Sequence, residues 1–294
     1  MDAADSYLIG LVGSGIGPSL SPPLHEREAA ELGLAYRYTR WDLDELGSAP
    51  DEVGDLLAEA RAAGYRGLNI THPCKQLVVE HLDELSPDAA ALGSVNTVVF
   101  EPGRAIGHNT DWSGFSRSLT RGLPGAPLDR LVLLGAGGAG SAVAHALLSL
   151  GAAELTVVDV DADRSAALAD GLRSRFGDDR VTAGTELTAA VAAADGLVHA
   201  TPTGMAEHPG LPLPAELLRP DLWVADVVYR PLRTELVEAA HERGCRVLPG
   251  GGMAVFQAAD ALELFTGVRP DAERMLRHFA ELVDPVAGGA GARA

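Results

Sequence analysis

The sequence predicts an α/β protein with two domains, the second built on a doubly wound parallel sheet. Its 294 residues exceed the size of most single domains, roughly 100 to 200 residues. Apolar runs of strand length alternate with segments of helical periodicity along the whole chain. A loop containing Pro124 and Pro127 separates two such series, and strands joined by helical crossovers form parallel sheets.

The first series covers residues 1–112 and predicts an α/β domain. Short apolar runs bounded by turn residues predict its strands, and amphipathic runs predict its helices. Gly64 is expected to end the second helix, because glycine readily adopts the left-handed conformation that follows many helices. The expected strands are Leu8–Val12, Tyr36–Trp41, Gly67–Ile70 and Thr97–Phe100, the expected helices are Pro22–Leu32, Asp51–Ala63 and Pro87–Leu92, and Lys75–Leu82 continues the alternation.

The second series covers residues 113–252. Its strands are expected at Leu131–Leu134, Leu155–Asp159, Leu197–Ala200, Trp223–Asp226 and Arg246–Leu248, with helices between them. The segments Met253–Leu264 and Pro270–Leu282 then predict helices that fold back on the first domain, so that residues 253–285 complete it. The Gly/Ala-rich residues 286–294 are expected to be a frayed tail.

The charge balance excludes polyanionic partners. The chain has 23 Lys and Arg against 41 Asp and Glu, a net charge of -18 at pH 7. Nucleic acids and anionic membrane surfaces attract proteins through basic residues that neutralise phosphates. We therefore expect neither nucleic acid nor a membrane surface as a partner.

Cysteine usage indicates a reducing compartment. Cys74 and Cys245 lie far apart and outside any C-x-x-C spacing. Asp2 and Asp5 precede only a short apolar stretch, unlike the basic start of a secretory leader. The uncharged segment Leu131–Ala153 is interrupted by five glycines and predicts a buried strand, turn and helix rather than a membrane span. A cytoplasmic location is expected.

A glycine-rich turn follows the first strand of the second domain. A pyrophosphate that binds backbone N–H groups at a helix N-terminus needs glycine there, because a Cβ would block its approach. Asp159 ends the next strand, 24 residues after Gly135, where a carboxylate can accept hydrogen bonds from ribose hydroxyls. The sequence predicts a dinucleotide site at Gly135, Gly137, Gly138, Gly140 and Asp159.

Asp159 also predicts the cofactor. A 2′-phosphate beside this carboxylate would meet like charge, which favours NAD over NADP. The arginine typical of NADP sites is absent from the next two positions, Val160 and Asp161, and Arg164 comes five residues after Asp159. Two interpretations without a ligand stay open, a tight strand-to-helix turn that binds nothing and an Asp159 carboxylate that only caps the next turn.

A lysine and a carboxylate lie in loops where they could serve as proton acceptor and partner in an NAD-dependent reaction. Dehydrogenation of an alcohol requires a group that takes the hydroxyl proton and a partner that fixes this group's position and charge. Lys75 follows the strand Gly67–Ile70 closely, and Asp111 lies in a loop after another strand. A Lys75/Asp111 pair could carry out the chemistry.

Over nearly its whole length the sequence resembles the shikimate/quinate dehydrogenase family. Five ordered motifs carry the resemblance. They are Ser19-Leu20-Ser21-Pro22 with His25, Asn69 to Lys75 (N-x-T-x-P-x-K), Gly93-Ser94-Val95-Asn96-Thr97, Asn109-Thr110-Asp111, and Met253 to Ala258 (M-x-x-x-Q-A).

The resemblance implies an N-terminal substrate-binding domain, a Rossmann domain, and a small cyclohexane or cyclohexene carboxylate as substrate. Lys75 would be the general base, with Asp111 its partner. The implied substrate-binding residues are Ser19 and Ser21 for the carboxylate and Thr71, Asn96 and Gln257 for the ring hydroxyls, and Tyr229, Gly250 and Met253 would border the nicotinamide.

Details of the resemblance favour the NAD-using quinate/shikimate branch. NADP-using members carry an Asn-Arg-Thr-like stretch where this chain has Asp159-Val160-Asp161. His72, Cys74, His108 and Thr201–Met205 also resemble that branch. Some quinate-oxidising members have Thr where Ser21 stands, so the resemblance predicts NAD use more firmly than quinate use.

Structural roles remain open for several of these side chains. Ser19, Ser21 and Asp111 could cap helices, and Asn96 and Gln257 could satisfy buried backbone groups. The histidines show no H-E-x-x-H or other ligand spacing, so we expect no metal site.

Other functions also stay open. They are an NADP-linked biosynthetic shikimate dehydrogenase, a relative acting on an aminated analogue, a non-catalytic dinucleotide sensor and a methyltransferase. The direction of the reaction and the choice between monomer and homodimer cannot be deduced from the sequence.

Overall fold

A computed structural model describes residues 6–184 and 186–283. The chain divides into two compact units, one formed by the residues up to Thr110 together with those from Gln257 onward, the other by Asp111–Phe256. The residues of the expected frayed tail, 286–294, lie outside the described part. None of the described helices combines the length and the apolar character that crossing a membrane would require.

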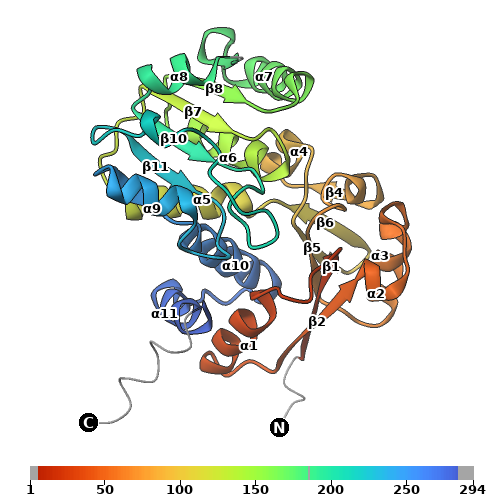
Figure 1. Cartoon of the computed structure of the whole chain (residues 1–294). Coiled ribbons are helices and arrows are strands. Elements are labelled where there is room, and N and C mark those ends of the chain that lie inside the picture. The colour runs from red at the N-terminus through yellow and green to blue at the C-terminus, as the bar shows by residue number, and fades with distance from the viewer. Residues whose placement is uncertain (1–5, 185, 284–294) are drawn as a thin grey trace, which may run out of the picture. The chain divides into compact units, whose positions relative to one another are not determined.

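The first unit contains a six-stranded mixed sheet in the order β2-β1-β3-β5-β6-β4 (Figure 1). β1 pairs in parallel with β2 and β3, whereas β5 runs antiparallel to both β3 and β6. The strands are β1 (Tyr7–Gly13), β2 (Tyr36–Asp42), β3 (Gly67–Ile70), β4 (Glu84–Leu85), β5 (Thr97–Glu101) and β6 (Arg104–His108).

β5 and β6 form an antiparallel hairpin that was not expected from the sequence, which predicted only its first strand. Only Pro102 and Gly103 connect β5 to β6, and Gly103 has a φ of 87°, a conformation that glycine adopts without strain. The Pro-Gly pair was the available signal for this turn. β4 has two residues and is too short for apolar periodicity to reveal it.

Helices cover both faces of the first sheet. One face packs against α3 through Val53, Leu56 and Leu57. The other face buries Ile9 of β1 with Phe265 of α10. The helices of this unit are α1 (Ser21–Glu31), α2 (Leu43–Leu46), η1 (Pro50–Glu52), α3 (Val53–Ala62), η2 (Leu77–His81), α4 (Pro87–Leu92) and α11 (Ala272–Val283), together with the part of α10 (Gly251–Thr266) from Gln257 onward.

One expected helix differs from the one observed, and a segment expected only to continue the alternation of strands and helices forms a 3-10 helix. The segment Asp51–Ala63 divides into the short 3-10 helix η1 and α3, because Pro50 opens a separate turn. The segment Lys75–Leu82 forms only the 3-10 helix η2, beginning at Leu77. Lys75 therefore lies in a turn ahead of this helix.

The second unit is a doubly wound parallel sheet, as the sequence predicts. Its order is β12-β11-β10-β7-β8-β9, and every neighbouring pair is parallel. Counted along the chain, this is the 3-2-1-4-5-6 order of dinucleotide-binding Rossmann domains. The strands are β7 (Arg130–Leu134), β8 (Glu154–Val158), β9 (Val181–Ala183), β10 (Gly196–His199), β11 (Trp223–Asp226) and β12 (Arg246–Leu248).

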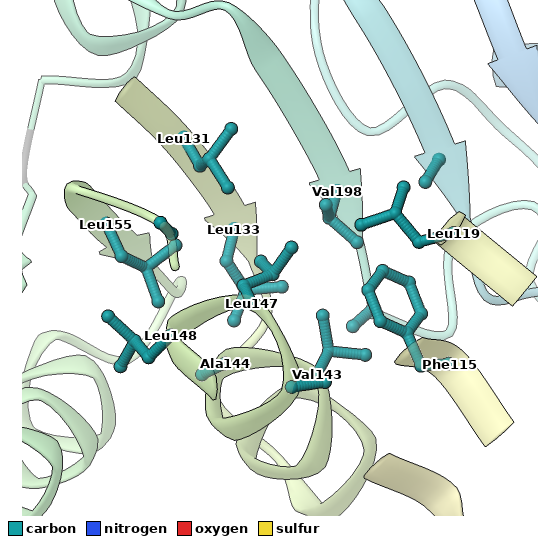
Figure 2. Close-up of a cluster of buried hydrophobic side chains, with 14 of the residues drawn as sticks. Phe115, Leu119, Leu131, Leu133, Val143, Ala144, Leu147, Leu148, Leu155 and Val198 are labelled. Carbon is teal, nitrogen blue, oxygen red and sulfur yellow. The ribbon is translucent and has the colours of Figure 1, made fainter. Parts of the chain in front are cut away.

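The helices of the second unit form a layer on each face of its sheet. Figure 2 shows one of these layers, where Val143 and Leu147 of α6 point toward Leu133 of β7 and Val198 of β10. Leu236 of α9 contributes to the core on the opposite face. The helices are α5 (Asp111–Gly122), α6 (Gly138–Ser149), α7 (Ala162–Phe176), η3 (Asp178–Arg180), α8 (Leu187–Ala193), η4 (Ala215–Leu217) and α9 (Glu235–Glu242).

Candidate active site and dinucleotide site

The three glycines of the G-x-G-x-x-G turn have three different structural roles. Gly135 has a φ of 104° and a Cβ there would lie 2.6 Å from the Ala200 carbonyl oxygen, so this position requires glycine. A Cβ on Gly140 would lie 2.0 Å from the Gly135 oxygen, which fixes the close packing of α6 on the turn. Gly137 precedes α6, whose first residue is Gly138.

The backbone at Gly138 is open to a ligand. A Cβ built on Gly138 would meet no atom within 4 Å, and the N-terminus of α6 starts at this residue. Helix N-termini present unpaired N–H groups and the positive end of the helix dipole, which suit a pyrophosphate. Gly135, Gly137, Gly138 and Gly140 therefore form a turn with the features of a dinucleotide cradle.

Asp159 lies immediately after β8 and is held against the glycine turn. Its Oδ2 accepts a 2.7 Å hydrogen bond from the Ala136 N–H, and its Oδ1 accepts one of 3.0 Å from the Asp161 N–H. Burial raises the pKa of the Asp159 carboxyl, but these N–H groups and the nearby Arg164 lower it further, so its pKa is below the usual value. The carboxylate is ionised and its position is fixed.

The structure brings Arg164, which comes five residues after Asp159 in the sequence, to this site. Its Nη2 lies 3.9 Å from Asp159 Oδ2, and a Cβ on Gly137 would lie 3.2 Å from the same nitrogen. Asp161 accepts hydrogen bonds from the Asp163 and Arg164 N–H groups and so begins α7. Asp161 as a helix cap was the sequence signal for the position of Arg164, because a helix that begins there places Arg164 in its first turn, near the end of β8.

The loop with the two serines is anchored by β2. The Asp42 carboxylate accepts hydrogen bonds from the Gly15 N–H (3.0 Å) and the Ile16 N–H (2.8 Å). Arg40 Nη2 donates a 3.1 Å hydrogen bond to the Ser19 carbonyl oxygen. No motif in the sequence indicated these roles for Asp42 and Arg40.

The serines open helix α1. The Ser19 hydroxyl accepts a 3.3 Å hydrogen bond from the Ser21 N–H, and Ser21 is the first residue of the helix. The N-cap of α1 is Leu20, which makes no side-chain capping hydrogen bond, so neither serine is the N-cap of this helix. The Ser19 O–H can donate to a ligand while its oxygen accepts from Ser21.

The segment around Lys75 packs against two neighbouring segments of the first unit. The His72 carbonyl oxygen accepts from the Ser14 N–H at 3.0 Å, and a Cβ on Gly13 would lie 2.3 Å from Thr71 Cγ2, so the segment lies close to the end of β1. The Lys75 carbonyl oxygen accepts a 2.8 Å hydrogen bond from the Val95 N–H. Lys75 is also the only lysine of the chain.

Asn96 connects this region to the segment before Asp111. Its Nδ2 donates to Thr110 Oγ1 at 2.9 Å, and its Oδ1 accepts from the Thr110 N–H at 2.7 Å. Asn69 supports it from behind, because Asn69 Nδ2 donates to the Asn96 carbonyl oxygen and Asn69 Oδ1 accepts from the Tyr38 hydroxyl at 2.7 Å. Asp111 follows Thr110 as the first residue of α5 and of the second unit.

The residues expected near the nicotinamide belong to the second unit, where Tyr229 and Gly250 follow the carboxyl ends of β11 and β12 and Met253 lies in the first turn of α10. A Cβ on Gly250 would lie 2.5 Å from the carbonyl oxygens of both Val227 and Val228, so Gly250 directly adjoins the segment that leads to Tyr229. Burial raises the pKa of Tyr229, which therefore keeps its proton at neutral pH. Met253 packs partly buried against the core of this unit.

The structure groups the predicted site residues by unit. The first unit holds Ser19, Ser21, Thr71, Lys75, Asn96 and Gln257, and the second holds Asp111, Gly135, Gly137, Gly138, Gly140, Asp159, Tyr229, Gly250 and Met253.

Within residues 6–184 and 186–283, no three His, Cys, Asp or Glu side chains form a group suited to a metal ion.

Comparison with protein families identifies segments of both units. The shikimate dehydrogenase substrate binding domain matches residues 11–98, and the Shikimate 5'-dehydrogenase C-terminal domain matches residues 250–278. The first match includes the two serines, Thr71, Lys75 and Asn96, and the second includes Gly250, Met253 and Gln257.

Individual relatives extend the similarity over nearly the whole chain. A shikimate dehydrogenase (NADP(+)) of Streptomyces avermitilis is 64% identical over 96% of this chain and 98% of the relative. A quinate/shikimate dehydrogenase (NAD(+)) of Corynebacterium efficiens is 48% identical over 95% and 99%. The structure of the quinate dehydrogenase from Corynebacterium glutamicum in complex with NAD matches with a TM-score of 0.89, 46% identity, and coverage of 94% and 99%. The resemblance is confirmed, and the chain belongs to the shikimate/quinate dehydrogenase family of oxidoreductases.

Proposed function

We propose that this enzyme catalyses the NAD-dependent, reversible oxidation of shikimate, and also of quinate, to the 3-dehydro ketone. The carrying observation is the hydrogen-bonded path from the Lys75 segment through Val95 and Asn96 to Thr110, whose next residue is Asp111. This path supports the proposal because it holds the Lys75 segment and the residue before Asp111 together within the first unit.

The roles of the residues follow from their chemistry. Lys75 accepts the proton of the ring hydroxyl as the C–H hydride passes to the nicotinamide, and Asp111 orients the lysine and balances its charge. Ser19 and Ser21 donate hydrogen bonds to the substrate carboxylate, and Thr71, Asn96 and Gln257 bind ring hydroxyls. In this proposal, residues 1–112 and 253–285 form the substrate-binding domain, and residues 113–252 form the Rossmann domain.

The cofactor site is proposed at the glycine turn. Gly138 and the N-terminus of α6 hold the pyrophosphate, Asp159 accepts hydrogen bonds from the adenosine ribose, and Tyr229, Gly250 and Met253 border the nicotinamide. The fixed, ionised Asp159 supports NAD, because a 2′-phosphate beside it would be repelled.

A second candidate is the NADP-linked shikimate dehydrogenase. Arg164, 3.9 Å from Asp159, could pair with a 2′-phosphate and offset that repulsion. Relatives at 64%, 62% and 58% identity carry NADP(+) in their names, whereas NAD(+) is named at 48%. A relative acting on an aminated substrate analogue remains a variant of this chemistry.

The proposed partners are small molecules, with the enzyme a monomer or homodimer. The net charge of -18 supports the absence of a nucleic-acid or membrane partner. Cys74 and Cys245 are both free and buried, which supports a reducing, cytoplasmic location. Family membership leaves the methyltransferase alternative without support.

Isotope transfer tests the proposed reaction. Shikimate deuterated at C3 is incubated with the enzyme and NAD, and the reduced nicotinamide is analysed by mass spectrometry. Direct hydride transfer predicts one deuterium in the reduced cofactor and a primary isotope effect on the transfer step. Cofactor binding without any transfer would contradict the proposal and support the dinucleotide sensor.

A further inference from the structure

A buried histidine–aspartate pair joins the ends of β10 and β11. His199 and Asp226 lie directly opposite each other in the parallel register, and His199 Nδ1 is 2.9 Å from Asp226 Oδ1. Both side chains are 0% exposed. Because burial of such groups is unfavourable unless every polar atom is paired, their other partners determine what the pair does.

Asp226 has two further partners. The Thr234 hydroxyl donates to Asp226 Oδ2 at 2.6 Å, and the Val228 N–H donates to Asp226 Oδ1 at 3.0 Å. The carboxylate therefore holds the start of α9, where Thr234 is the N-cap, and the chain that leads from β11 to Tyr229.

The imidazole extends the network in the opposite direction. His199 Nε2 is 2.5 Å from Thr201 Oγ1, which accepts a hydrogen bond from the Thr203 N–H at 3.3 Å. Each ring nitrogen of His199 therefore has one partner, Asp226 at Nδ1 and Thr201 at Nε2.

Both ends of the network lie beside the proposed cofactor site. Gly135 of the glycine turn approaches Ala200, the residue before Thr201, so closely that a Cβ would lie 2.6 Å from the Ala200 oxygen. Gly250 adjoins Val228 in the same way at the other end. In open α/β sheets, ligands bind outside the carboxyl ends of the strands, where these loops lie.

We propose that the hydrogen-bonded chain Thr201–His199–Asp226–Thr234 is a positioning device for the dinucleotide. It holds the Thr201–Thr203 loop and the Val228–Tyr229 segment in their binding conformation before the cofactor arrives, so that binding does not have to order them. His199 is a positioning residue and takes no part in proton transfer. The inference rests on the proposed cofactor site of the same unit.

Substitutions at both ends of the chain test the device. Thr201→Val and Thr234→Val each remove one hydroxyl at nearly constant volume, and Thr201→Ser and Thr234→Ser restore it. Thr182→Val is the matched control, because the hydroxyls of Thr182 and Thr156 pair at the exposed edge of the same sheet. NAD and shikimate binding are measured by calorimetry on the full chain, with thermal unfolding followed in parallel.

The device predicts a specific pattern of affinities. Both valine variants should raise the Kd for NAD roughly tenfold, the loss typical of one hydrogen bond, and should leave the Kd for shikimate within about twofold. The serine variants should recover NAD affinity, and Thr182→Val should bind as the wild type does. Thr234 is only 1% exposed, so an effect there acts through Asp226 and not through direct contact with the cofactor.

Three outcomes would overturn the inference. Unchanged NAD affinity in folded Thr234→Val would show that the network does not transmit the effect of Thr234, and any loss in Thr201→Val would then come from a direct contact of Thr201 with NAD. Lower unfolding temperatures with unchanged NAD affinity in both variants would make the network purely structural. Equal losses of NAD and shikimate affinity would indicate general damage. Should Thr234→Val fail to fold, Asp226→Asn is tested with the same expectations. A wild-type chain that binds no NAD would instead refute the proposed cofactor.

Discussion

Asn96 and Thr110 are joined by hydrogen bonds between their own groups, among them one from Asn96 Nδ2 to Thr110 Oγ1 at 2.9 Å and one from the Thr110 N–H to Asn96 Oδ1 at 2.7 Å. Both residues are at most 3% exposed. Paired, buried groups of this kind fix the backbone at Thr110. Asp111 is the next residue in the chain, so its starting position is fixed by this pairing. Asn96 therefore carries a structural role in addition to the proposed contact with a ring hydroxyl.

Asn96→Ala should weaken both folding and catalysis. The substitution removes Asn96 Oδ1, the acceptor of the buried Thr110 N–H, which costs about 1 to 3 kcal/mol of unfolding free energy. Urea unfolding and initial rates measure the two effects. Equal stability of wild type and Asn96→Ala would show that this pairing does not stabilise the fold.

Lys75→Ala should lower kcat on the order of 10² to 10⁴-fold with a much smaller change in substrate affinity, because positioned proton transfer acts mainly in the transition state. Stopped-flow measurement of the hydride step gives the rate constant of that step without interference from product release. Added methylamine should restore part of the rate. A near-normal rate in the alanine variant would remove Lys75 from the mechanism.

The single lysine allows an independent check of Lys75. An amine-directed reagent can modify only this side chain and the N-terminal amine, so mass spectrometry separates the two sites. Shikimate should slow modification of Lys75 and leave the N-terminal amine unaffected. Equal rates with and without shikimate would place Lys75 away from the substrate.

Ser21→Ala should weaken both shikimate and quinate, by about 1.5 to 3 kcal/mol in kcat/KM, through loss of a charge-assisted hydrogen bond to the carboxylate. Ser21→Thr keeps the hydroxyl and adds a methyl group. It should shift the ratio of the kcat/KM values for shikimate and quinate, because the carboxylate leaves a planar ring carbon in shikimate and a tetrahedral one in quinate. Ser174→Ala is the control, since that hydroxyl donates to the Gly171 carbonyl in an exposed helix. Unchanged kinetics in Ser21→Ala would leave this serine as a helix residue only.

His25 predicts a pH-dependent loss of stability. Burial lowers its pKa to about 3, whereas an unfolded histidine titrates near 6.5. Between these values the unfolded chain binds more protons, so the unfolding free energy decreases as the pH falls below about 6.5. The contribution of His25 between pH 6.5 and 5.5 is about 1 kcal/mol.

Substitution separates this contribution from that of other groups. Urea unfolding of His25→Phe should show a smaller loss of stability between pH 6.5 and 5.5 than the wild type, whatever its stability at neutral pH. His208→Gln, on an exposed loop, should keep the wild-type loss. A His25→Phe variant with the full wild-type loss would contradict the assignment.

The sequence predicted the parts of the molecule that depend on local pattern. Apolar runs and glycine punctuation located five of the six strands of the second sheet and the turn at Gly135. Strand β9 was missed because Val181–Ala183 is too short for a periodic signal. Asp159 was predicted at a strand end because its place in the βαβ unit follows from spacing along the chain.

Contacts between distant residues could not be deduced from the sequence alone. His199 and Asp226 are 27 residues apart and meet only through the register of β10 and β11. Arg40 reaches the Ser19 carbonyl from a neighbouring strand in the same way. A motif names residues within one segment, whereas these partners depend on how separate segments pair.

The most direct test of the proposed function is an initial-rate matrix of shikimate and quinate against NAD and NADP with the purified enzyme. Asp159 predicts a higher kcat/KM with NAD for both substrates, and replacing it by Asn together with Val160→Arg should narrow the difference. Shikimate and quinate should both be oxidised with NAD. A wild-type enzyme that prefers NADP with either substrate would contradict the cofactor assignment, and absent turnover of both substrates would contradict the proposed reaction.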